Sequence, residues 1–205
     1  MRVVALEPTA QYLTVRHTHP DFAMAFTKLF YLAALALSFG ASSEAMDICA
    51  YTSRNCVGTY GCCTNVPVNT CCTWGTSSGY GWSVRFQNTG PNWFGRSYGD
   101  ANCVTSTGGI GSPTPGPSCL SVWDAPNYIN WGSARWTPYS AAGATAREAG
   151  GECRLPDVLG YTDSEGNQHT VKVPVERFDE ALSAIEAEDY AVLKEFEHVD
   201  IATAD

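Results

Sequence analysis

The sequence predicts an all-β, disulfide-rich domain followed by a small, acidic α+β unit. Two observations carry this prediction. Eight cysteines lie close together in a stretch that is rich in glycine and tryptophan. No segment of this stretch repeats apolar residues at the spacing of a helix over a useful length. The charge then changes sharply, because residues 46–149 carry a net charge of +1 and residues 150–205 carry −10. We expect a cysteine-rich domain over 46–140, a linker over 141–151 and an acidic unit over 152–205.

The cysteines predict an oxidising compartment, where disulfides persist. The sequence alone leaves their pairing open. A ninth cysteine, Cys153, either bridges to Cys119, which releases another cysteine, or remains a thiol. The eight cysteines expected to form four disulfides are Cys49, Cys56, Cys62, Cys63, Cys71, Cys72, Cys103 and Cys119.

Residues 1–45 read as an N-terminal extension and a secretory signal peptide, with translation expected to start at Met24. The apolar run Leu29–Phe39 is about half of the roughly 20 residues that cross a bilayer, so we expect no membrane span in the mature chain. Ser43 and Ala45 occupy the positions that a signal peptidase requires, which places cleavage directly after Ala45. These features predict a secreted, extracellular protein.

Short β-type runs bounded by turn residues cover the cysteine-rich half. Ser83–Phe86 and Ser133–Trp136 alternate polar and apolar residues, as half-buried strands do. Tyr51–Tyr60 and Leu120–Trp123 also read as strands. Aliphatic residues are few here, so we expect the six tryptophans to supply much of the buried surface.

The segment YTSRNCVG at Tyr51–Gly58 has the aromatic and glycine spacing of a βγ-crystallin Greek-key hairpin, with Cys56 where that family has an aromatic residue. Ser83–Phe86 looks like the strand that follows in the family, and Ser133–Trp136 looks like a second copy. The chain resembles βγ-crystallins over residues 48–139, and the resemblance implies a double Greek key. Another small disulfide-rich β domain, shaped by its cysteines, is the alternative.

Many βγ-crystallins bind calcium through acidic or amide residues shortly before the serine of that strand. The matching positions here are Ser78, Gly79, Tyr128 and Ile129, which offer no carboxylate for a hard cation. The adjacent cysteines lack the spacing and the histidines of a zinc site. We expect no metal ion and no other cofactor.

Residues 46–149 contain no histidine and no lysine, the groups most used for acid–base chemistry. Asp100 and Asp124 could act as a glycosidase-like carboxylate pair, but their surroundings favour two loop carboxylates. The acidic balance argues against nucleic acid and against an anionic membrane surface as partners. We therefore expect a protein without enzymatic activity.

The acidic unit begins with a predicted hairpin, Val158–Tyr161 with His169–Val173, around the turn sequence TDSEGN. A helical stretch follows Pro174, and its apolar stripe changes phase at Glu186–Asp189. This change predicts either two short helices or one bent helix. His169 and His198 are expected on the solvated surface.

Three function classes follow from these observations. The first is a secreted, non-enzymatic recognition or effector protein, whose partner is an extracellular protein or a cell-wall polysaccharide bound by exposed aromatic rings. The second is an antimicrobial or killer-toxin-like protein, and the third is a secreted glycoside hydrolase. We favour the first, with Trp74 and Trp82 as candidate ligand-binding residues because glycines surround them. These two residues could equally belong to the core.

Overall fold

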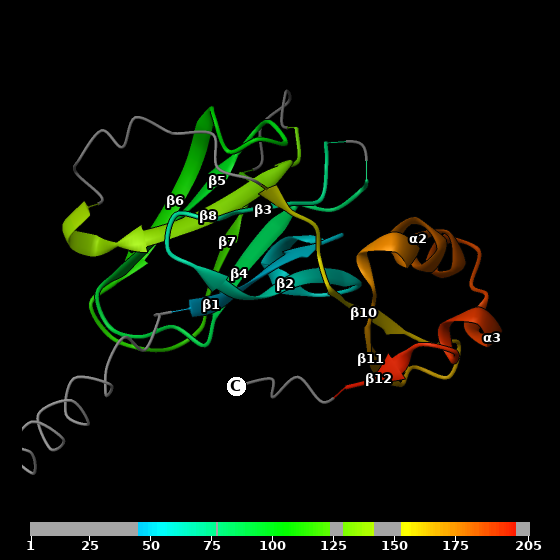
Figure 1. The fold of residues 1–205 in the computed structure, drawn as a ribbon. Coiled ribbons are helices and arrows are strands. Elements are labelled where there is room, and N and C mark those ends of the chain that lie inside the picture. The colour runs from blue at the N-terminus through cyan, green and yellow to red at the C-terminus, as the bar shows by residue number, and fades with distance from the viewer. Residues whose placement is uncertain (1–44, 77, 124–128, 142–152, 200–205) are drawn as a thin grey trace, which may run out of the picture. The chain divides into compact units, whose positions relative to one another are not determined.

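A computed structural model of the chain describes residues 45–76, 78–123, 129–141 and 153–199 (Figure 1). The expected signal peptide, Asp124 and almost all of the expected linker lie outside these residues. In chain order, the elements are β1 (Ala45–Tyr51), η1 (Arg54–Cys56), β2 (Tyr60–Pro67), β3 (Cys71–Thr73), β4 (Ser83–Gln87), β5 (Trp93–Tyr98), β6 (Ser106–Ser112), β7 (Ser118–Ser121), β8 (Ser133–Pro138), η2 (Tyr139–Ala141), β9 (Cys153–Arg154), β10 (Val158–Thr162), β11 (Gln168–Lys172), η3 (Val175–Arg177), α2 (Phe178–Glu186), α3 (Tyr190–Leu193) and β12 (Glu197–His198).

The strands form two sheets, which confirms the predicted β architecture for the described residues. One sheet has seven strands in the order β12-β11-β10-β2-β1-β4-β7, and the other has five in the order β6-β5-β8-β3-β9. The first eight strands fall into two repeats of four. In each repeat the first, second and fourth strands are neighbours in one sheet, while the third strand joins the other sheet. The two repeats therefore exchange strands, because β3 of the first repeat and β7 of the second each lie in the sheet of the other repeat.

The two repeats also share their register. Tyr51 of β1 pairs with Ser83 of β4, and Tyr98 of β5 pairs with Ser133 of β8. Both predicted Ser-initiated strands are thus confirmed, as β4 and β8. The third predicted strand, Leu120–Trp123, is shifted, because β7 covers Ser118–Ser121.

The prediction of a continuous strand from Tyr51 to Tyr60 is wrong, because the chain folds back between β1 and β2. Asn55 and Cys56 adopt consecutive positive φ angles of 63° and 55°, which turn the chain away from the extended conformation. The Oγ of Ser83 anchors this turn, since it donates to the carbonyl of Ser53 at 2.6 Å and accepts from the N–H of Cys56 at 2.9 Å. A buried serine from the next strand in the sheet therefore holds the hairpin.

The second repeat contains an equivalent hairpin between β5 and β6. The Oγ of Ser133 donates to the carbonyl of Asp100 at 2.6 Å and accepts from the N–H of Cys103 at 3.1 Å. Cys103 has a φ of 55°, as Cys56 does. Both hairpins thus end on a cysteine in the same strained conformation, held by the same serine contact.

Four disulfides connect these parts, and they use all eight cysteines that the sequence analysis assigned to disulfides. Cys119 is bonded to Cys56, so the alternative in which it bridges to Cys153 is wrong. In each repeat, the hairpin cysteine is bonded to the strand that the other repeat contributes to its sheet. The four pairs are Cys49–Cys62, Cys56–Cys119, Cys63–Cys72 and Cys71–Cys103.

The main core lies between the sheets and is built largely from aromatic side chains. Phe86 from β4 and Trp93 from β5 are fully buried, with ring centroids 5.3 Å apart. Gly95 makes this packing possible, because a Cβ there would lie 2.4 Å from the Phe86 ring. The expectation that tryptophans fill the core holds for four of the six, Trp74, Trp93, Trp131 and Trp136.

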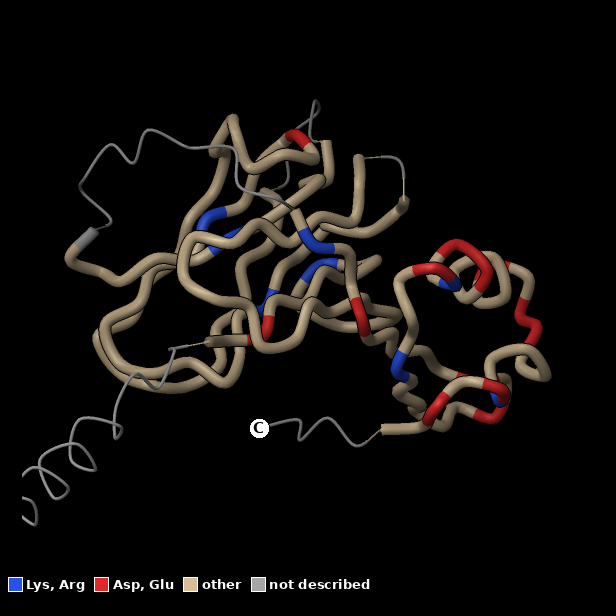
Figure 2. Tube along the Cα trace, viewed as in Figure 1, with Lys and Arg blue, Asp and Glu red and all other residues tan. Residues whose placement is uncertain are grey.

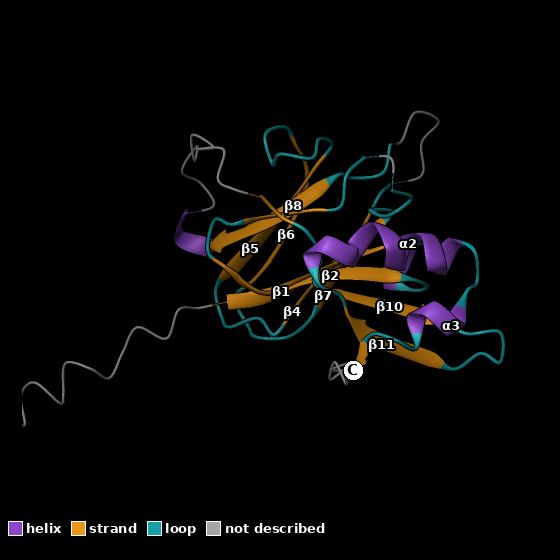
Figure 3. Cartoon of the chain, turned by 45° about the vertical axis from the view of Figure 1, so that its right-hand side comes forward, coloured by secondary structure: helices purple, strands orange, loops and turns teal. Residues whose placement is uncertain are grey.

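The C-terminal strands extend the seven-stranded sheet, since β10 pairs with β2 and the hairpin of β10 and β11 continues it. Figure 3 shows α2 and α3 on the same side of the molecule as these strands. Leu159 and Val171 form a second core with the helices, and Leu182 packs against both cores. Two helices are present, separated at Glu188, whose φ is 54°.

Replacement Ser83→Ala should destabilise the domain. It removes one acceptor and one donor from a site where Ser83 is fully buried, which leaves backbone groups of the first hairpin unpaired. Such a loss typically costs about 1–3 kcal/mol. Urea denaturation should show this loss in the free energy of unfolding, while the control Ser106→Ala, in an exposed part of β6, should change it little. Equal stability of S83A and S106A would contradict this role.

Candidate functional site

The two tryptophans singled out in the sequence do not form an exposed pair. Trp74 is 4 % exposed, and its indole Nε1 donates to the carbonyl of Trp131 at 2.5 Å. Trp82 is half-buried against the main core, with the Arg54 guanidinium 5.7 Å from its ring centroid. Trp74 is therefore part of the core, and Trp82 exposes only part of its ring to solvent.

The most exposed tryptophan of the described residues is Trp123, at 81 % exposure. It follows β7, and the preceding Val122 is buried and donates its N–H to the carbonyl of Trp82 at 3.0 Å. The chain is anchored again at Trp131, whose N–H donates to the carbonyl of Gly81 at 3.0 Å. Val122 and Trp131, on either side of Trp123 in the sequence, are thus both buried and hydrogen-bonded.

A groove of about 550 Å³ lies beside Trp123, between β6 and β7. Its floor is Trp131, against which Gly108 packs so closely that a Cβ there would lie 2.8 Å from the indole. Ile129, at 70 % exposure, lies on the rim with Trp123. None of the described residues that line the groove carries a charge, and together they offer apolar surface, glycine backbone and two hydroxyl groups. Its lining residues are Gly99, Thr107, Gly108, Gly109, Leu120, Ser121, Val122, Trp123, Ile129 and Trp131.

A second, shallower hollow of about 420 Å³ adjoins Trp123. It is lined by Arg54 and Asn55 of the first hairpin together with Ser121 and Val122. The N–H of Asn55 donates to the Oγ of Ser121 at 2.9 Å, so the hairpin and β7 are joined here. Trp123 lines both hollows, and a ligand longer than one ring could contact it from either side.

The histidines lie in a separate cluster on the C-terminal hairpin. His169 Nε2 lies 2.7 Å from Asp163 Oδ2, and its ring stacks on Tyr161 with centroids 5.2 Å apart. Tyr190 stacks on the other side of Tyr161, and the exposed His198 meets His169 edge-on. The expectation of a solvated His169 is therefore wrong, because the side chain is half-buried and bonded to a carboxylate.

The hydrogen bond from His169 holds the pKa of the Asp163 carboxyl well below its usual range. Backbone N–H groups of Glu165 and Asn167 also donate to this carboxylate at 2.9 Å and favour its charged form. The Asp163 carboxylate thus stabilises the turn between β10 and β11. We therefore assign this cluster a structural role in the hairpin.

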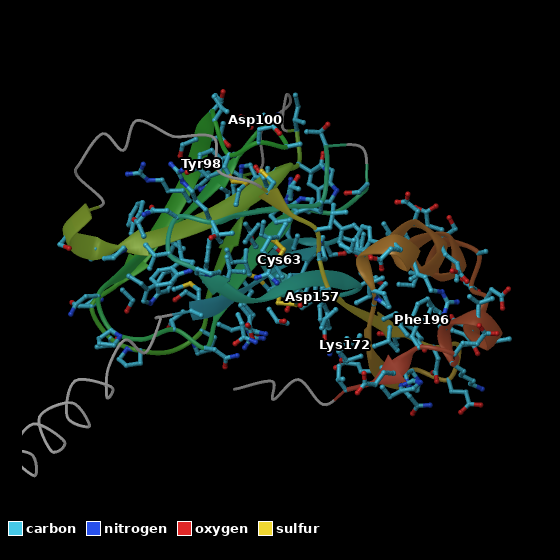
Figure 4. The ribbon with its side chains drawn as sticks, viewed as in Figure 1. Cys63, Tyr98, Asp100, Asp157, Lys172 and Phe196 are labelled. Atoms are coloured by element: carbon cyan, nitrogen blue, oxygen red, sulfur yellow. A yellow bond between two sulfur atoms is a disulfide. The ribbon has the colours of Figure 1, made fainter. Side chains whose placement is uncertain are left out.

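Another hollow, of about 720 Å³, is bounded by β9, β11, η3 and the segment Glu195–Glu197 that follows α3. Asp157, Lys172 and Phe196, labelled in Figure 4, line it, together with Cys153 and Arg154. The Asp157 carboxylate is already engaged, because it accepts from the N–H and the hydroxyl of Thr64 at 2.7 and 2.6 Å. Three acidic and three basic side chains are among its described lining residues, so the hollow favours no one ligand charge.

Asp100, one of the two carboxylates suggested as a catalytic pair, is engaged in a turn. Asp100 accepts from the N–H groups of Asn102, Val104 and Thr105, and these bonds outweigh burial and lower its pKa. Its suggested partner, Asp124, lies outside the described residues. Within the described part of the chain, no group of three or more histidine, cysteine or acidic side chains is arranged to hold a metal ion, and no helix is long and apolar enough to cross a membrane.

The described residues thus define a disulfide-bonded β protein with two sheets and one uncharged, tryptophan-rimmed groove. Residues 47–157 match the model of the protein family ARB_05566_N, which is described as an N-terminal domain. The match covers more than half of the chain, so the protein belongs to this family. It ends directly before β10. Comparison with curated proteins and with solved structures finds no match.

Replacement Asp163→Asn should lower the thermal midpoint by a few degrees near pH 6. The folded state depresses the pKa of Asp163, so its contribution to stability is present above about pH 4 and is lost progressively as the pH falls below that value. The midpoints of D163N and the parent should therefore converge at low pH. The control Asp179→Asn, on the exposed face of α2, should follow the parent at every pH. A constant difference between D163N and the parent would contradict this assignment.

Proposed function

We propose that this chain is a secreted, non-enzymatic recognition protein that binds a neutral cell-wall glycan in the groove beside Trp123. The β domain is a double Greek key of the βγ-crystallin kind, stabilised by disulfides in place of calcium. The exposure of Trp123 at the rim of an uncharged groove carries the ligand part of the proposal.

The exchange of β3 and β7 between the sheets supports the double Greek key. The serine contacts to both hairpins support it further, because the same hydrogen bonds recur in each repeat. A sequence match underlies them, since Tyr51–Val57 and Tyr98–Val104 both fit Tyr-x3-Asn-Cys-Val. This pattern supplies the counterpart to the first hairpin within the second repeat.

Four disulfides in a domain of this size support an extracellular location, because thiols stay reduced in the cytosol. The signal peptide expected from the sequence also favours an extracellular location. A protein that works outside the cell needs stability against dilution and proteolysis. Bridges that constrain the unfolded chain supply such stability, each typically about 2–4 kcal/mol.

The chemistry of the groove supports a sugar ligand. A pyranose ring presents C–H groups on its faces and hydroxyl groups around its rim. Trp123 offers an indole face for the first, while Thr107, Ser121 and the backbone of Gly109 offer hydrogen-bonding groups for the second. The lining residues that the structure describes include no carboxylate, imidazole or amine, which favours a neutral polysaccharide and binding without hydrolysis.

Purified protein should be retained on an insoluble neutral polysaccharide, with chitin and β-glucan as the first two tested. Trp123→Ala should weaken retention by at least about 30-fold, the effect of losing a binding hot spot of about 2 kcal/mol. Because the Trp123 side chain is exposed, the thermal midpoint of the W123A variant should stay within about 1–2 °C of that of the parent protein.

Tyr139→Ala is the matched control, since Tyr139 is an exposed aromatic residue outside the groove, at 56 % exposure. It should bind as the parent does. Equal retention of W123A and Y139A, or no retention on any neutral polysaccharide, would refute the glycan proposal. Release of soluble sugar from the polysaccharide would refute its non-enzymatic part.

A further inference from the structure

The two sheets end in four edge strands, and these differ greatly in length and charge. β12 and β9 have two residues each and include Glu197 and Arg154, and β7 has four residues. β6 has seven residues, Ser106–Ser112, with the sequence STGGIGS and no charged side chain. Natural edge strands are usually kept short or carry charges that prevent unwanted pairing. Among the described edges, β6 alone has neither protection.

The outer edge of β6 has no hydrogen-bonded strand beside it among the described residues. Among the described residues, only β5 pairs with it. In an antiparallel pair, every second residue directs its N–H and C=O away from the partner strand, so β6 presents such groups outward. Ser106, Thr107, Gly109 and Gly111 are exposed. Glycines at three positions of the strand also leave the edge free of bulky side chains.

The other repeat shows how such an edge is used in this molecule. By position in its repeat, β6 corresponds to β2, the second strand of the first repeat. The edge of β2 is covered by β10, which pairs with it over Val158–Gly160. Gly61 of β2 allows the close approach, because a Cβ there would lie 3.2 Å from Leu159 Cδ2. The equivalent edge in the first repeat therefore accepts an added strand at a glycine.

We propose that β6 is a strand-addition site and that its occupant is β6 of a second copy of this chain. Two identical strands can pair antiparallel about a two-fold axis, which satisfies the outward groups of both copies with one self-complementary contact. The two five-stranded sheets then become one continuous sheet. This proposal concerns the backbone edge and does not rest on glycan binding.

The distribution of charge favours a second copy at this edge. Most acidic residues of the described chain lie in the C-terminal elements (Figure 2), and the chain has a net charge of −9. The strands β10 to β12 lie at one end of the seven-stranded sheet, whereas β6 lies against β7 at the other end. Pairing through β6 keeps the two acidic regions apart, while contact through β12 would bring them together.

Sedimentation velocity and hydrogen exchange test this proposal on the full secreted chain. From about 1 μM to about 500 μM, the range of moderate to weak affinities, the protein should pass from monomer to dimer. Amide exchange in residues 106–112 should slow over the same range, whereas exchange in β2 should not depend on concentration. The double variant Ser106→Lys with Thr107→Lys should raise the dimer dissociation constant at least about tenfold, since lysines protect edge strands.

The matched control is Val57→Lys with Val175→Lys, which adds the same charge at positions that are 58 % and 52 % exposed and lie outside β6. It should dimerise as the parent does. A monomer at every concentration would overturn the proposal. So would a dimer in which S106K/T107K is unaffected, or one in which exchange at 106–112 stays fast.

Discussion

The exchange of β3 and β7 between the sheets is the constraint on which the rest of the structure depends. Each repeat gives its third strand to the other sheet, so neither repeat can complete its sheet alone. The disulfides Cys56–Cys119 and Cys71–Cys103 fix this arrangement, because each joins a hairpin to the strand that has crossed over. With few aliphatic residues available, the core between the sheets relies on aromatic side chains from both repeats, such as Phe86 and Trp93.

The groove is a consequence of the same exchange. β7 leaves its own repeat to lie at the edge of the seven-stranded sheet, and Val122 then binds the backbone of Trp82. This contact places Trp123 at the side of the molecule where β6 and β7 lie against each other. The third strand of the second repeat therefore connects the fold to the ligand site that we propose. Because Trp123 is exposed, the binding role that we propose for it takes no side chain from the core.

The sequence predicted much of the fold, because short strands that begin at Ser83 and Ser133 have a clear alternating pattern. The strand reading of Tyr51–Tyr60 missed the turn at Asn55 and Cys56, which the hairpin resemblance of Tyr51–Gly58 implied. Asparagine often adopts a positive φ angle but cysteine rarely does, so composition signals only part of such a turn. The second hairpin could have been found from the repeated Tyr-x3-Asn-Cys-Val pattern at Tyr98. Trp123 could not have been singled out, because the exposure of a tryptophan depends on the sheet that its strand joins, and that choice is made by long-range contacts.

Peptide mapping under non-reducing conditions tests the exchange of strands most directly. We expect one linked peptide pair that joins Cys56 to Cys119 and another that joins Cys71 to Cys103. Both pairs cross between the repeats and have sequence separations of 63 and 32 residues. Recovery of both would support the exchanged arrangement. A hairpin cysteine bonded within its own repeat, such as Cys103 to Cys119, would contradict it.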